Sequence, residues 1–70
     1  MRFSYNKLWK LLIDRGMNKQ RLKEVSGISS ASVAKLGKGA NVHTDVLLKI
    51  CMGLNCDVGD IMEIIEEDDY

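Results

Sequence analysis

The chain has 70 residues and a mass of 7.9 kDa, a length that we expect to form a single domain, 1–70, around one small core. Its hydrophobic fraction of 46% and charged fraction of 29% exclude a disordered chain. The net charge is zero, but it is divided unevenly. Residues 1–56 hold ten basic and three acidic residues, a net charge of +7, whereas 57–70 holds seven acidic and no basic residues, a net charge of −7. The basic part predicts an anionic partner.

Several functional classes are excluded by what the sequence lacks. No apolar run approaches the roughly 20 residues that span a bilayer, and the first residues lack the apolar core of a signal peptide, so we expect a cytoplasmic protein without a membrane. Cys51 and Cys56 are expected to be reduced thiols. With one histidine, His43, the chain offers no credible metal site or catalytic constellation. We therefore expect no enzyme, no cofactor and no small-molecule ligand.

The first half of the chain predicts three short helices. The first covers about 5–15, with Ser4 as its N-cap and Gly16 as its end. The second follows Asn18, another good cap, and reaches about residue 25. The third begins at Ser29 or Ser30 and reaches about residue 36, with a small, polar outward face.

The second half predicts a loop and two further helices. Glycines and an asparagine indicate a loop over 37–43, and Thr44 is expected to cap a fourth helix that ends near 53–55. A last short helix is expected after Asp57, because apolar residues recur at helical spacing: Val58, Ile61, Met62 and Ile65. Residues 66–70 are expected to form an acidic, solvated tail. The fold class is therefore all-α, a compact domain of five short helices.

The stretch Lys19–Leu36 carries the functional signal. Two short helices meet at a tight turn that contains Gly27, which suits a positive φ. Four apolar residues at the right spacing are expected to face inward and fix the angle between the helices: Leu22, Ile28, Val33 and Leu36. This is the pattern of a helix-turn-helix, whose second helix lies in the major groove of DNA.

The turn Ser26-Gly27-Ile28-Ser29 and the order of the helices resemble the Cro/repressor-type (XRE-like) helix-turn-helix family over about residues 5–65. Two positions depart from the family pattern, since Lys23 replaces a usual alanine and Gly37 a frequent glutamate. We expect Lys23 to extend outward. The resemblance implies a lambda-repressor-like fold with the helix-turn-helix at helices 2–3. It also implies a transcriptional regulator, a repressor, that binds double-stranded DNA as a dimer on a palindromic operator.

Candidate DNA-binding residues follow from this pose. The start of the second helix attracts a phosphate through its free amides and dipole. From the third helix, Lys35 can donate to guanine, and Ala31 can contact a thymine methyl group. The loop after the third helix is placed to bind the phosphate backbone of the DNA. The full set is Asn18, Lys19, Gln20, Ser29, Ser30, Ala31, Ser32, Lys35, Lys38 and Asn41.

Alternative interpretations remain open from the sequence. Each lysine alone could simply be solvated, and Ser29 could act as an N-cap only. A different functional class is a protein-binding module such as an antitoxin or adaptor, with the acidic tail engaging a basic partner. Apolar residues that a small monomer does not cover suggest a homodimer through the last helices: Met1, Phe3, Leu48, Ile64 and Ile65.

Overall fold

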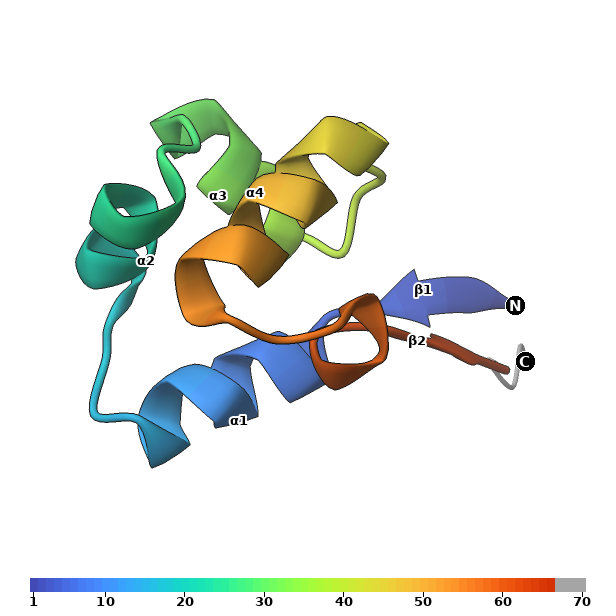
Figure 1. The fold of residues 1–70 in the computed structure, drawn as a ribbon. Helices are drawn as coiled ribbons and strands as arrows, with labels where there is room; N and C mark the ends of the chain where they lie inside the picture. The colour runs from blue at the N-terminus through green and yellow to red at the C-terminus, as the bar shows by residue number, and fades with distance from the viewer. Residues whose placement is uncertain (67–70) are drawn as a thin grey trace.

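A computed structural model describes residues 1–66 (Figure 1). Four α-helices, one 3-10 turn and a two-stranded sheet make up this part of the chain. In chain order the elements are β1 (Arg2–Ser4), α1 (Asn6–Asp14), α2 (Lys19–Ser26), α3 (Ser30–Gly37), α4 (Thr44–Leu54), η1 (Val58–Asp60) and β2 (Glu63–Ile65). Of the acidic tail expected over 66–70, all but Glu66 lies outside the described residues.

One core joins all four helices and η1. Its fully buried members are aliphatic and come from every helix, as expected for short helices that cannot stand alone in water. The buried apolar residues are Tyr5, Leu8, Leu12, Leu22, Ile28, Val33, Leu36, Ile50, Leu54 and Ile61. Among the elements, α4 packs most extensively against α2, so α4 supports the helix-turn-helix from behind.

The predicted helix boundaries hold at α2 and α3 and fail in part at α1 and α4. Asn18 and Ser29 cap their helices through side-chain oxygens. At α1 the capping residue is Tyr5, which makes no side-chain cap bond, and the Ser4 hydroxyl accepts instead from the Asn6 amide at 3.3 Å. Thr44 was wrong as a cap, because it is the first residue of α4 and His43 precedes it.

The predicted fifth helix is wrong, and the domain is predominantly helical, with four α-helices rather than five and a short two-stranded sheet. Asp57 and Asp60 form a capping box that closes a single 3-10 turn, and the chain then extends into β2. Ile61, at the end of that turn, is fully buried, so this part of the helical pattern reflects core packing. A short isolated helix is marginally stable, whereas the β-branched Ile64 and Ile65 suit a strand.

The strand that replaces the helix pairs with the beginning of the chain. β1 and β2 are antiparallel, with Phe3 opposite Ile64 and Ser4 opposite Glu63. The sheet lies at the end of the molecule remote from α2 (Figure 1). Lys7 of α1 donates to the carbonyl of Gly59, which ties η1 to α1. The sheet therefore closes the domain by joining its first and last elements.

The packing of α4 on α2 depends on the absence of a side chain at Gly53. A Cβ at this position would lie 2.5 Å from the carbonyl oxygen of Val25 and 3.0 Å from the Cα of Ser26. These are backbone atoms of the last turn of α2, which cannot rotate away as a side chain could. Gly53 thus sets the distance between α4 and the turn of the helix-turn-helix.

We predict that Gly53→Ala lowers the free energy of unfolding by about 1–3 kcal/mol, because the added methyl group forces α4 away from α2. Denaturant unfolding measures the change. Gly59→Ala is the matched control, since a Cβ there meets nothing within 4 Å, and its effect should stay within about 0.5 kcal/mol. Equal effects of the two substitutions would contradict the close approach.

Candidate nucleic-acid interface

The turn between α2 and α3 is built from three consecutive residues. The Ser26 hydroxyl, which is buried, donates to the Leu22 carbonyl at 2.6 Å and accepts from the Ile28 amide at 3.4 Å. Gly27 adopts the left-handed conformation with φ 75°, and its amide donates to the Lys23 carbonyl at 2.8 Å. A side chain is disfavoured at this φ, so glycine allows α3 to leave α2 at a sharp angle.

The four residues predicted to face inward are all buried. Leu22 and Leu36 are at most 1% exposed, Ile28 is 6% exposed and Val33 is 8% exposed. They join the same core as α1 and α4, so the angle between α2 and α3 is fixed by packing. The opposite side of the two helices faces solvent.

The outward side of α3 differs from the prediction at one residue. Ser29, Ser30, Ala31 and Lys35 are exposed, as expected. Ser32 is half-buried: its amide donates to the Ser29 hydroxyl at 3.1 Å, and the two hydroxyls lie 3.2 Å apart. Ser29 and Ser32 therefore stabilise the first turn of α3, which leaves Ser30, Ala31 and Lys35 as its most available side chains.

Lys23 belongs to this surface although the sequence did not predict it as a site residue. Its ammonium group donates to the Ser30 hydroxyl at 2.7 Å, across the turn from α2 to the start of α3. Lys23 as a whole is half-buried, whereas its bond to Ser30 lies at an exposed position, so the expected outward extension holds in part. A positive charge thus lies beside the first turn of α3. The lysine in place of the family's usual alanine is the feature of the sequence that could have indicated it.

The beginning of α2 presents one lysine in a fixed position. Lys19 and Gln20 are exposed, and the side-chain Oδ1 of Asn18 accepts from the Arg21 backbone amide at 2.8 Å. The Lys19 ammonium lies 4.9 Å from the centre of the Trp9 ring in α1, which restrains it by a cation–π contact. No local sequence pattern links these two residues, so this role of Trp9 was missed.

The loop after α3 is tied to α1. The Tyr5 hydroxyl donates to the Ala40 carbonyl at 3.1 Å, although the two residues are 35 positions apart. Lys38 and Asn41 lie on either side of this anchor, and both are exposed. Burial of the Tyr5 ring raises the pKa of its hydroxyl above the ordinary 10.0, so it stays a donor at neutral pH.

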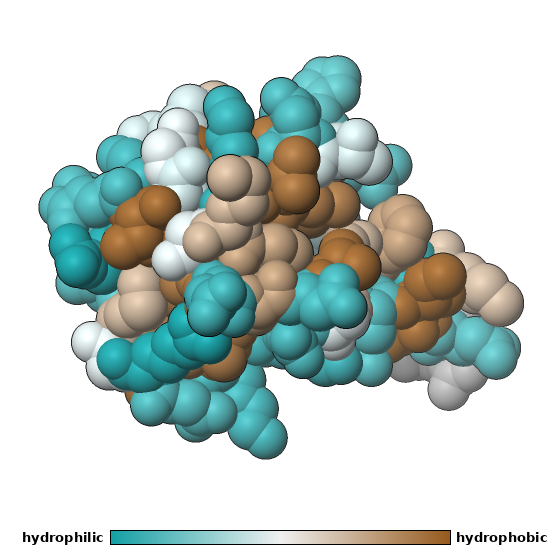
Figure 2. All heavy atoms as spheres, in the orientation of Figure 1, coloured by the Kyte–Doolittle hydropathy of each residue, from teal (hydrophilic) through white to brown (hydrophobic). Residues whose placement is uncertain are grey.

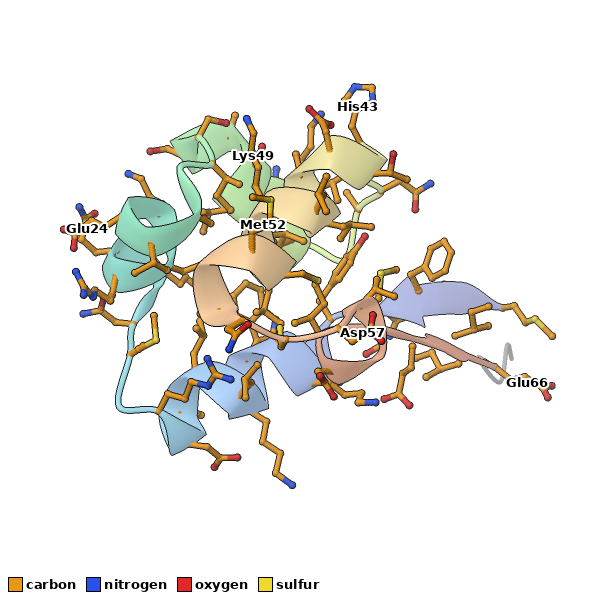
Figure 3. The ribbon with its side chains drawn as sticks, in the orientation of Figure 1. Glu24, His43, Lys49, Met52, Asp57 and Glu66 are labelled. Carbon is orange, nitrogen blue, oxygen red and sulfur yellow. The ribbon has the colours of Figure 1, made fainter. Side chains whose placement is uncertain are left out.

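The charge of this region is almost wholly positive. Residues 15–44 hold six basic residues and a single acidic one, Glu24. Glu24 extends from the outer side of α2 and pairs with Arg21 at 3.1 Å (Figure 3). Within 1–66, Lys35 and Lys38 form no ion pair. The helix-turn-helix therefore presents uncompensated positive charge around a small, weakly polar helix face.

Comparison with known families agrees with this geometry. The family of Cro/C1-type helix-turn-helix DNA-binding domains matches residues 7–67. The chain therefore belongs to that family, as its turn residues predicted, and this is a class of DNA-binding domains and not of enzymes. The match includes η1 and β2, so the strand at the end of the chain is part of the matched domain.

A crystal structure of the transcriptional regulator VanUg (Form II) is similar to this chain throughout. The two sequences are 61% identical, the TM-score is 0.88, and the match covers 94% of this chain and 88% of that one. The curated proteins gave no significant match. In the part of the chain that the structure describes, no helix is long and apolar enough to cross a membrane, and no three potential metal ligands lie together.

We predict that Trp9, the one tryptophan of the chain, reports on phosphate binding at Lys19. A phosphate that attracts the ammonium group weakens the cation–π contact, so the fluorescence of Trp9 should change when duplex DNA is added. The Lys19→Met variant keeps the aliphatic stem and removes the charge, and its fluorescence should not respond. An equal response from the variant would contradict the coupling.

We predict that stability falls in alkaline solution through Tyr5. The raised pKa means that the unfolded chain releases this proton first, so the stabilisation is present below about pH 10 and is lost as the pH rises through the raised value. Unfolding across this range should show a steeper decline for the natural chain than for Tyr5→Phe. If the stability of the two proteins falls in parallel as the pH rises, Tyr5 is not the cause of the decline.

Proposed function

We propose that the chain is a sequence-specific regulator of transcription that binds double-stranded DNA in the cytoplasm. The observation that carries this proposal is the outward side of α3, where Ala31 and Lys35 are exposed in a region, 15–44, that holds six basic residues and one acidic residue. A helix of this diameter fits the major groove. The similarity to VanUg supports a regulatory role, and we propose that it is repression by occupation of a promoter.

Each element has a distinct task in this proposal. Lys35 donates to guanine and Ala31 contacts a thymine methyl group, so α3 reads sequence. Lys19 and Gln20 bind a phosphate at the start of α2, where the amides and the dipole add to the attraction. Lys38 and Asn41 bind the backbone beyond α3 and fix its depth in the groove.

Recognition by this surface depends more on phosphates than on base edges. α3 presents only one long polar side chain, Lys35, to the bases, because Ser32 is half-buried and Ser30 accepts a hydrogen bond from Lys23. Discrimination per half-site is therefore modest, and affinity falls steeply with salt as counterions are released.

We further propose that two copies bind a palindromic operator, with their α3 helices about 34 Å apart. Apolar side chains exposed on the sheet support a homodimer, since Met1 is 88%, Phe3 41% and Ile64 63% exposed. Figure 2 shows hydrophobic residues on the sheet and, separately, over α4. The original expectation of a dimer through the last helices fails in part, because the final helix is a strand.

We predict that selection of bound sequences from random duplex DNA enriches a short palindrome. Substitution of two lysines should then distinguish residues that give sequence specificity from residues that give general affinity. Lys35→Ala should cost about 1–3 kcal/mol on the selected site and relax one base position. Lys38→Ala should weaken all duplexes alike and reduce the salt slope by about one. The control is Lys10→Ala in α1, outside this surface, which should change neither.

Two results would contradict these assignments. If the selection enriches no sequence over random duplex DNA, the protein does not recognise a specific sequence. Equal behaviour of Lys35→Ala and Lys10→Ala would remove α3 as the reading element. The alternative, a protein-binding module such as an antitoxin or adaptor, predicts instead that both lysine variants keep their partner and that deletion of 66–70 releases it.

A further inference from the structure

α4 ends in a geometry that brings two cysteines together. Asn55 takes the left-handed conformation, with φ 53° and ψ 57°, and the Cys56 amide donates to the Cys51 carbonyl at 3.0 Å. This hydrogen bond closes a loop of six residues and brings Cys56 back onto the last turn of α4. Side chains at these two positions normally make an apolar contact. Here both positions are cysteine.

The two thiols share one partly open site. Both are half-buried, and both line a hollow between α4 and η1 with the apolar side chains of Leu48, Met52 and Val58. Figure 3 locates the segment between Met52 and Asp57, where α4 passes into η1. A small solute can therefore reach the pair from solvent, while α4 and η1 hold the pair together.

The thiols also interact directly. Burial, the neighbouring Cys51 with which Cys56 shares a hydrogen bond, and Asp60 all raise the pKa of the Cys56 thiol, whereas Arg15 lowers it. The raised pKa holds Cys56 in its thiol form at neutral pH. Since the thiolate is the nucleophile, its reactions become faster as the pH rises.

We propose that Cys51 and Cys56 are a reversible redox pair that closes to an intrachain disulfide when the protein meets a disulfide oxidant such as oxidised glutathione. The thiolate of one cysteine attacks the oxidant and releases one glutathione thiolate. The second cysteine then attacks the mixed disulfide and releases the other. Two electrons and two protons leave the dithiol, and two molecules of reduced glutathione form.

The disulfide would form at the C-terminal end of α4, which already contacts α1 and α2. Arg15, which caps the end of α1, donates to the Leu54 carbonyl, and Gly53 lies against the last turn of α2. A covalent link at 51–56 restricts the unfolded chain and leaves this junction in place. The oxidised protein is therefore more resistant to unfolding than the reduced one. This proposal does not rest on the DNA-binding function.

The test equilibrates the full chain with mixtures of reduced and oxidised glutathione, then traps free thiols and measures the intact mass. Because the chain has two cysteines, a monomer lighter by two hydrogen atoms identifies this disulfide. We expect it to be the main oxidised form and to be favoured at least about tenfold over the same equilibrium in denaturant. The Tm should rise by roughly 5 °C on oxidation.

The matched control moves one thiol by a single residue. Cys51→Ser with Met52→Cys keeps two cysteines but places one on the outer side of α4, where Met52 is 72% exposed. This variant should form mixed glutathione disulfides instead. Two results would overturn the proposal. One is that the natural chain forms mainly mixed glutathione disulfides or disulfide-linked dimers. The other is that the intrachain disulfide forms no more favourably in the folded chain than in denaturant.

Discussion

The close approach of α4 to the backbone of α2 is the constraint on which the rest of the structure depends. At Gly53 a single added methyl group would meet the Val25 carbonyl and the Ser26 Cα, so the two helices are held at backbone contact. Ser26 also supplies the hydroxyl that bonds to Leu22 and Ile28 within the turn. The angle of α3 is thus set from behind by α4 and from within by the turn.

The surface that faces away from this packing is the one that we propose to bind DNA. α1 contributes to it indirectly, because Trp9 restrains Lys19 and Tyr5 anchors the loop that carries Lys38 and Asn41. η1 and β2, which carry Asp60 and Glu63, lie on the other side of the molecule from α2 (Figure 1). The basic residues of α2 are therefore separated from these two acidic residues.

Much of this was predictable because it depends on local chemistry. The caps at Asn18 and Ser29, the glycine at the turn and the four inward residues are each encoded by spacing and side-chain type. β2 was missed because its partner, β1, lies at the other end of the sequence, and apolar spacing alone cannot distinguish a helix from a turn followed by a strand. Trp9 was missed for the same reason, since its contact with Lys19 exists only after α1 and α2 pack.

We propose that the outward side of α3, with the start of α2, is the surface that binds DNA. Backbone amide resonances of the isotope-labelled chain, followed while a selected duplex is added, test it directly. We expect the largest shifts at 18–20 and 29–38, whereas η1 and the parts of the sheet away from a dimer contact should be nearly unchanged. Shifts confined to the sheet, η1 or the outer side of α4, with 29–38 unchanged, would contradict it.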